Sequence, residues 1–205
     1  MQRQTAGSRP DADLVPGLRS GEEWAFEELL RRFETRVYNL ARSVTRSESD
    51  AQDVLQDTFL SVFRKVSTFK EESSLSTWIY RIAVNAALMK VRRRRHDDRS
   101  VPIEDCLPRY DETGRRIATL PDWPPRADDV LLRKELAAHL GEAIRDLEPG
   151  HRAVFVLRDQ EGLSTEQVAS VLELSVPAVK SRLHRARLFL RERIKEYWLG
   201  GAAGS

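Results

Sequence analysis

Residues 162–194 read GLSTEQVASVLELSVPAVKSRLHRARLFLRERI, and their pattern predicts two helices separated by a tight turn. Ser164 is followed three residues later by Gln167, which is the spacing of a capping box at a helix start. Residues 173–175 are expected to form the turn. Pro177 then falls in the first turn of the next helix, where its missing N–H costs little. This order is typical of a helix-turn-helix.

The second of these helices separates an apolar side from a basic side. At 100° per residue, the apolar side carries Val179, Leu183, Ala186 and Leu190, and the other side carries Pro177, Lys180, Ser181, His184 and Arg185. In a DNA major groove, Lys180 or Arg185 would reach guanine acceptors or phosphates. Ser181 or His184 would reach base edges or the backbone. Charge alone would favour a solvated helix face, but the capping box, the turn and the separated sides together favour DNA binding.

Composition limits the classes of protein that fit this chain of 205 residues, which is long enough for one or two cores. The net charge is only +2, so any nucleic-acid binding must come from local clusters such as residues 90–95 and 180–195. The single cysteine, Cys106, excludes an intrachain disulfide and a cysteine-based zinc site. The start lacks the apolar segment of a secretory signal, so a cytoplasmic location is expected.

The chain is predicted to be all-α, with two small helical bundles joined by a flexible tether, because no convincing strand alternation occurs. Helical periodicity runs through residues 22–43, 50–66 and 77–95, and it resumes from Val130 to Trp198 in about four pieces. The second of these helices can be capped by Ser47 or Ser49, and the third by Ser76 or Thr77. Between the bundles, a proline-broken acidic segment reads as a linker. The expected divisions are a flexible arm 1–19, a first domain 20–95, a linker 96–131, a second domain 132–198 and a tail 199–205.

The predicted helix 50–66 places Leu60 opposite its apolar face, with Phe63 at the edge. A single exposed leucine is normal in a soluble protein. The carboxylates and glutamines around it give the alternative, a surface that binds a partner. The pattern leaves both interpretations open.

The stretch TWIYRIAVNAALMKVRRRR, residues 77–95, is apolar almost all round. Its polar stripe consists of Arg81, Asn85 and Arg92, and Trp78 borders the stripe. The asparagine either bonds to a neighbouring helix, since a buried amide must be satisfied, or faces nucleic acid beside an aromatic plane and a cation. Spacing alone does not decide. The apolar run is too short and too interrupted to span a membrane.

Three motifs give the chain a resemblance to a known family. They are DAQDVLQDTFLSVFRKVSTF at 50–69, FKEESSLSTWIYRIAVNAA at 69–87 and EGLSTEQVASVLELSVPAVKSRLHRARLFLRE at 161–192. In this order and spacing they resemble an extracytoplasmic-function (ECF) sigma factor of bacterial RNA polymerase, in the RpoE-like branch of the sigma-70 family. The resemblance covers about residues 20–95 and 132–196. It implies that the first domain is a sigma-2 domain and the second a sigma-4 domain.

The resemblance implies three sets of functional residues. The helix 50–66 would bind the clamp coiled coil of the polymerase β′ subunit through Asp50, Asp53, Gln56, Asp57, Leu60 and Phe63. The loop 69–77 and the following helix would melt and hold the −10 promoter element through Ser73, Ser74, Trp78, Arg81, Asn85, Lys90 and Arg92. The helix-turn-helix 164–190 would bind the −35 element as duplex through Pro177, Lys180, Ser181, His184 and Arg185.

The implied partners are core RNA polymerase, including its β flap, promoter DNA and an anti-sigma factor; no membrane insertion and no cofactor or metal is implied. The acidic linker is either a nucleic-acid mimic that threads the polymerase channels or a solvated tether. Two departures from the family pattern are visible. Pro177–Ala178 stands where the family often has Gly-Thr, and Gln56–Asp57 stands where it has Gln-Glu.

Three other classes of protein are alternatives to this interpretation. A helix-turn-helix regulator that acts without joining polymerase would leave Trp78 and Asn85 without a role. A helical enzyme finds little support, because the four histidines lack metal-ligand spacing and no phosphate loop or nucleophile motif is visible. A pure interaction bundle would leave both arginine clusters unexplained. The expectation is therefore a protein that is not an enzyme.

Overall fold

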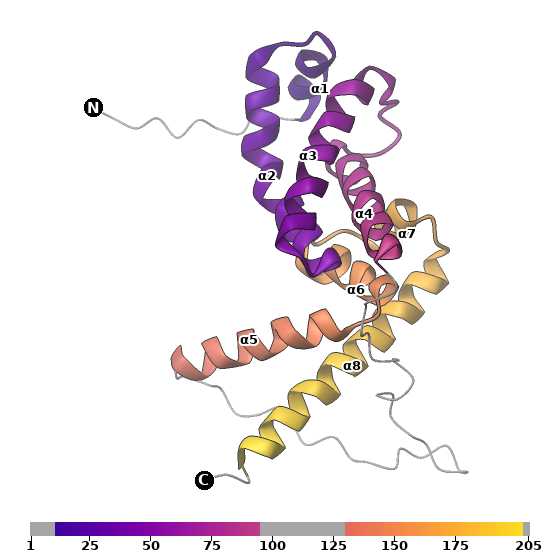
Figure 1. Cartoon of the computed structure of the whole chain (residues 1–205). Helices are drawn as coiled ribbons and strands as arrows, with labels where there is room; N and C mark the ends of the chain where they lie inside the picture. Colours follow the sequence, from indigo (N-terminus) through magenta and orange to yellow (C-terminus); the bar gives the residue numbers. More distant parts are fainter. Residues whose placement is uncertain (1–10, 95–129, 203–205) are drawn as a thin grey trace. The chain divides into compact units, whose positions relative to one another are not determined.

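The structure is a computed structural model that describes residues 11–94 and 130–202. These residues are helical with short connections and divide into two compact units, one up to Arg93 and one holding most of the later chain (Figure 1). The predicted all-α class and the two helical domains are confirmed. The predicted linker lies outside the described residues, apart from 130–131, and so does Cys106.

The first unit is a bundle in which α2, α3 and α4 pack against one another (Figure 1). Its elements are α1 (Asp11–Arg19), α2 (Glu23–Thr45), α3 (Glu48–Lys65), the 3₁₀ turn η1 (Val66–Thr68) and α4 (Leu75–Arg93). Fully buried apolar residues such as Val37, Val54 and Ala83 come from all three long helices. The amphipathic periodicity of each helix therefore meets in one core, where apolar burial stabilises the fold.

The flexible arm predicted for residues 1–19 is wrong for its second half, because residues 11–19 form α1. Leu14, Val15 and Leu18 are buried, and α1 packs on α2 and on η1. Pro16 lies within this helix but does not prevent it. Residues 1–10 lie outside the described residues.

Side-chain caps fix where α3 and α4 begin. Ser47 accepts a hydrogen bond from the Asp50 N–H at 3.2 Å, which confirms one of the two predicted caps of α3. The predicted cap of α4 at residue 76 or 77 is wrong. The Oγ of Ser74 accepts from the N–H of Thr77 at 3.2 Å, and α4 begins at Leu75. Consecutive serines in this loop offer several equivalent caps, so the sequence did not discriminate between them.

The second unit comprises α5 (Val130–Asp146), α6 (Pro149–Phe155), the π-helical turn η3 (Val156–Gln160), α7 (Thr165–Leu172) and α8 (Val176–Ala202). Both α5 and α6 pack on α8. Leu147, Leu157 and Phe189 are fully buried in this unit. The predicted tail from residue 199 is wrong for its first part, because α8 continues to Ala202.

The helix-turn-helix is closed by local hydrogen bonds at each boundary. The Ser164 N–H donates to Gln167 Oε1 at 2.7 Å, and the Gln167 N–H donates to Ser164 Oγ at 3.2 Å, so the predicted capping box is confirmed. Helix α7 ends at Leu172, the following residue Glu173 has a left-handed φ of 54°, and the Leu174 N–H donates to the Ala169 carbonyl. These bonds set the turn that leads into α8.

Candidate nucleic-acid and partner surfaces

Helix α8 presents the basic side that its periodicity predicts. Its apolar set is buried: Val179, Leu183, Ala186 and Leu190. The residues on the opposite side are exposed: Pro177, Lys180, Ser181, His184 and Arg185. The Ser175 Oγ accepts from the Ala178 N–H at 3.3 Å, which caps the start of α8. The five candidate residues thus lie together along one accessible helix face, starting in its first turns.

Not every cation of α8 belongs to this face. Arg187 makes two hydrogen bonds to Asp159 of η3, at 2.9 and 2.7 Å, and this contact raises the pKa of the guanidinium. Arg193 Nη2 lies 2.7 Å from Asp146 Oδ2 of α5. These pairs tie α8 to η3 and to α5. The long basic cluster seen in the sequence therefore divides into an outward face and bridges that hold the unit together.

Asn85 is exposed on α4, so the interpretation in which its amide is buried against a neighbouring helix is wrong. It follows Arg81 by four residues and Trp78 by seven, so the three lie along one side of α4. Arg81 and Trp78 are half-buried, and Arg92 is exposed near the end of the helix. The polar stripe predicted from the sequence is therefore accessible at Asn85 and Arg92.

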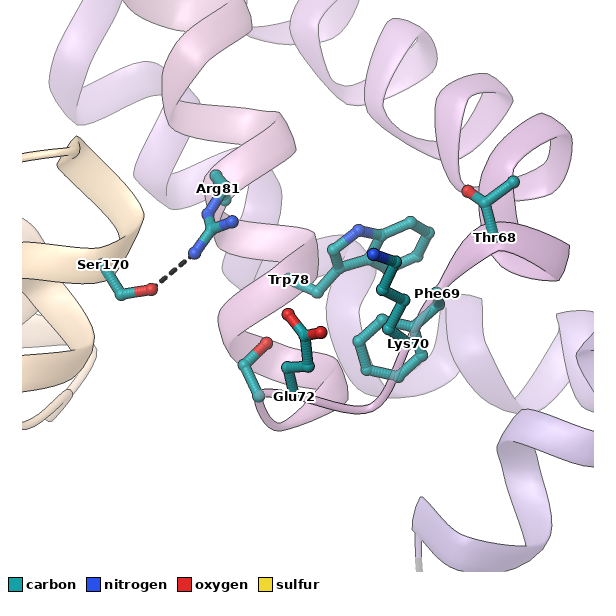
Figure 2. A pocket seen from close by; sticks show the side chains of 8 residues that line it. Thr68, Phe69, Lys70, Glu72, Trp78, Arg81 and Ser170 are labelled. Carbon is teal, nitrogen blue, oxygen red and sulfur yellow. Dashed lines mark hydrogen bonds between the residues drawn. The ribbon is translucent and has the colours of Figure 1, made fainter.

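The loop between η1 and α4 and the first turns of α4 supply most of the residues that line a pocket (Figure 2). The Trp78 indole packs on the Phe69 ring with 5.0 Å between ring centroids and 32° between planes. Around this aromatic pair lie Lys70, Ser73 and Arg81, with Thr68 and Glu72. Ser74 is exposed beside the pocket but is also the cap of α4.

The sequence-based site set omitted Phe69, Lys70 and Glu72, which line the same pocket. Phe69 is an aromatic residue within a polar loop, and it is buried. This aromatic residue among polar neighbours was the signal in the sequence that could have identified the pocket, since such a residue usually marks the point where a loop is attached to the core.

Helix α3 forms, with α2, an exposed apolar groove on the first unit. Leu60 and Phe63 are 43% and 61% exposed, and Leu30 of α2 is 42% exposed. Phe26 of α2 packs on Phe63 with 5.1 Å between ring centroids. The lining residues are Phe26, Leu29, Leu30, Glu34, Gln52, Leu55, Gln56, Phe59, Leu60 and Phe63. Sequence reasoning found the α3 side and missed the α2 side, because the α2 residues that line the groove belong to the same apolar stripe as its core residues.

Two members of the predicted sets are placed differently from expectation. Asp50 is only 6% exposed, because a two-residue connection from α2 brings the first turn of α3 close to the packed helix ends, so it is not part of the exposed surface. Lys90, assigned to the −10 set, lies with its Nζ 2.7 Å from Asp53 Oδ2, a residue of the polymerase-binding set. Asp53, Gln56 and Asp57 are exposed.

No described helix is long and apolar enough to cross a membrane. Among the same residues, no group of histidine, cysteine and carboxylate side chains has the arrangement of a metal site.

Comparison with known proteins identifies both units. The family models Sigma-70 region 2 and Sigma-70, region 4 match residues 29–96 and 138–190. The RNA polymerase sigma-H factor of Pseudomonas aeruginosa is 33% identical, over 86% of this chain and 90% of that protein. The ECF RNA polymerase sigma factor SigM of Mycobacterium tuberculosis is 33% identical, over 87% and 82%. The solved structure of CnrH in complex with the cytosolic domain of CnrY is similar, with a TM-score of 0.60, 29% identity and coverage of 88% and 94%.

Both sigma-70 regions occur in this order, and the similar proteins match over most of their length. The chain therefore belongs to the ECF sigma factors of the sigma-70 family, which are transcription-initiation factors of bacterial RNA polymerase.

Proposed function

We propose that the first unit holds the −10 promoter element as a single strand and that the second unit binds the −35 element as duplex, while the α2–α3 groove binds core polymerase. The observation that carries this proposal is the contrast between the two accessible surfaces. One is an aromatic pocket beside an exposed asparagine, and the other is a continuous basic helix face.

The first surface suits unpaired bases. A base leaves the duplex only if its unstacking cost of a few kcal/mol is offset by stacking and by hydrogen bonds to its exposed edge. Trp78 and Phe69 supply aromatic planes, and Asn85 supplies a donor and an acceptor on the same side of α4. Lys70 and Arg81 line the pocket and give it positive charge for the phosphates.

The second surface suits duplex DNA, in which the bases stay paired. A B-DNA major groove admits one helix, and the side chains from its first turns reach the base edges. Lys180, Ser181, His184 and Arg185 lie in those turns of α8 and are exposed. Pro177 at the start of the helix replaces a residue with an N–H, so it offers only an apolar contact and a carbonyl at that point.

The groove between α2 and α3 suits a protein partner. Leu60, Phe63 and Leu30 form an apolar centre, and Asp53, Gln56 and Asp57 form an exposed polar rim on α3. An apolar centre with a polar rim is the usual anatomy of a protein interface. We propose that this groove receives the β′ clamp coiled coil, and that the second unit contacts the β flap.

Regulation by an anti-sigma factor is part of the proposal. CnrH, a similar protein, was solved with the cytosolic domain of CnrY bound to it. A partner that covers the groove or either DNA-binding surface would keep this chain from polymerase. The same assignment places the chain in the cytoplasm, where polymerase and promoter DNA are found.

Runoff transcription with purified core polymerase tests the proposal. The template is a promoter library randomised at both elements, from which transcribed sequences are selected and read. We expect defined −10 and −35 preferences that depend on the chain, and loss of promoter opening in Asn85→Ala with core association intact. If the free chain bound duplex DNA specifically and core polymerase ignored it, the alternative of a regulator that acts without polymerase would replace the proposal.

A further inference from the structure

Arg19, the last residue of α1, contacts the loop that forms the −10 pocket. Its guanidinium donates a hydrogen bond to the Phe69 carbonyl and forms an ion pair with Glu71, with 2.8 Å between Nη1 and Oε1. Both contacted residues belong to the loop before α4, fifty or more positions later in the chain. One side chain therefore holds this loop at two points.

The loop segment that Arg19 contacts includes a residue with an unfavourable backbone conformation. Glu71 has a φ of 59°, a left-handed conformation that is unfavourable for a residue with a Cβ. It stands between Lys70 and Glu72, whose side chains line the pocket, and two residues after Phe69, on which Trp78 packs. A change in this segment would therefore move the pocket wall.

The helix that carries Arg19 is itself firmly seated. Leu14 and Leu18 are buried at 0% and 1% exposure. Gly17 lies against α2 so closely that an added Cβ would stand 2.6 Å from Trp24 Cζ2 and 2.9 Å from Ala25 Cβ. A planar guanidinium with several donors at the end of such a helix can bond a carbonyl and a carboxylate at once, which an ammonium does less well.

We propose that Arg19 is a positioning residue for −10 recognition: it holds Phe69 and Glu71 so that the pocket keeps the shape that selects the unpaired base, and it does so without touching DNA. This inference rests on the proposed function of the pocket. Arg19 and Glu71 are 37% and 56% exposed, so their ion pair is screened and contributes little to stability. The expected effect is therefore on selectivity more than on folding.

The test uses the full chain bound to core polymerase and single-stranded −10 oligonucleotides, one with the preferred sequence from the promoter library and one mismatched at the flipped base. For Arg19→Ala we expect the affinity ratio between these oligonucleotides to fall about fivefold, since part of one base contact is lost. Arg19→Lys should recover part of the ratio. Arg31→Ala is the matched control, because Arg31 is also exposed and forms an ion pair, with Glu28 at 2.6 Å on α2.

Each outcome of this test either supports or overturns the inference. A lower ratio with unchanged core affinity supports it, and Glu71→Gln should lower the ratio in the same direction even if Arg19→Ala does not fold. An unchanged ratio in both variants would overturn it. If Arg19→Ala lowered both the affinity for core polymerase and the thermal stability but left the ratio unchanged, the inference would also be overturned, since Arg19 would then have a merely structural role. If Asn85→Ala loses discrimination while Arg19→Ala and Glu71→Gln do not, only this inference fails and the proposed function stands.

Discussion

The two candidate DNA surfaces differ in how they are built. The α8 face comes from one helix, so its residues are related by the helix geometry alone. The pocket proposed for the −10 element is lined by the loop from Phe69 and by the start of α4, and Arg19 at the end of α1 contacts this loop from fifty positions earlier in the chain. A surface for duplex DNA can be a straight rod, whereas a pocket for an unpaired base needs walls on several sides.

The largest expected effect separates polymerase binding from both DNA surfaces. Leu60→Asp places a carboxylate in the apolar centre of the α2–α3 groove, where a partner would bury it without compensation. We expect core association, measured by titration of labelled chain, to weaken at least tenfold, as for a central interface residue. Met89→Asp is the control, because Met89 is 51% exposed on α4 and does not line the groove. Equal weakening by both variants would mean that the groove is not the surface that binds core polymerase.

The second prediction tests how tightly α1, which carries Arg19, is packed on α2. Gly17→Ala would force the new Cβ against Trp24, and we expect the first unit to lose about 1–3 kcal/mol of stability. Gly141→Ala in α5 meets nothing within 4 Å, and we expect a gain of about 0.5–1 kcal/mol in the second unit. Hydrogen exchange of buried amides in α2 and in α8 measures each change within the full chain. If Gly17→Ala did not lower the stability of the first unit, α1 would not be packed on α2 as described.

These differences explain how much the sequence could predict. The two sides of α8 followed from periodicity, because exposure around a single helix depends only on the angle between residues. The burial of Asp50 and the ion pair between Lys90 and Asp53 did not follow, because both depend on how α3 meets its neighbours. Helix α1 was missed because polar residues with Pro10, Pro16 and Gly7 indicate a loose arm, and only the packing of Leu14 and Leu18 overrides this signal.

The smallest expected effect concerns pH and the second unit. Burial lowers the pKa of His151 in α6, and the positive charges of Arg182 and Arg185 lower it further. Glu148, whose Oε2 lies 3.2 Å from His151 Nδ1, has the opposite effect on this pKa. The unfolded chain therefore binds this proton more readily than the folded chain. Stability of the second unit should fall as pH decreases through about 6.5, the ordinary histidine value. Hydrogen exchange of α6 and α8 amides at pH 7.5 and 5.5 measures it, and His151→Gln should reduce the fall.

The most direct test of the division between the two surfaces uses two probes on the same complex with core polymerase: a single-stranded −10 oligonucleotide and a duplex −35 oligonucleotide. We predict that Asn85→Ala weakens only the single-stranded probe and that Lys180→Ala weakens only the duplex, each by about 1–3 kcal/mol. Binding losses that ignore this division, with either variant weakening both probes or the opposite probe, would contradict the account.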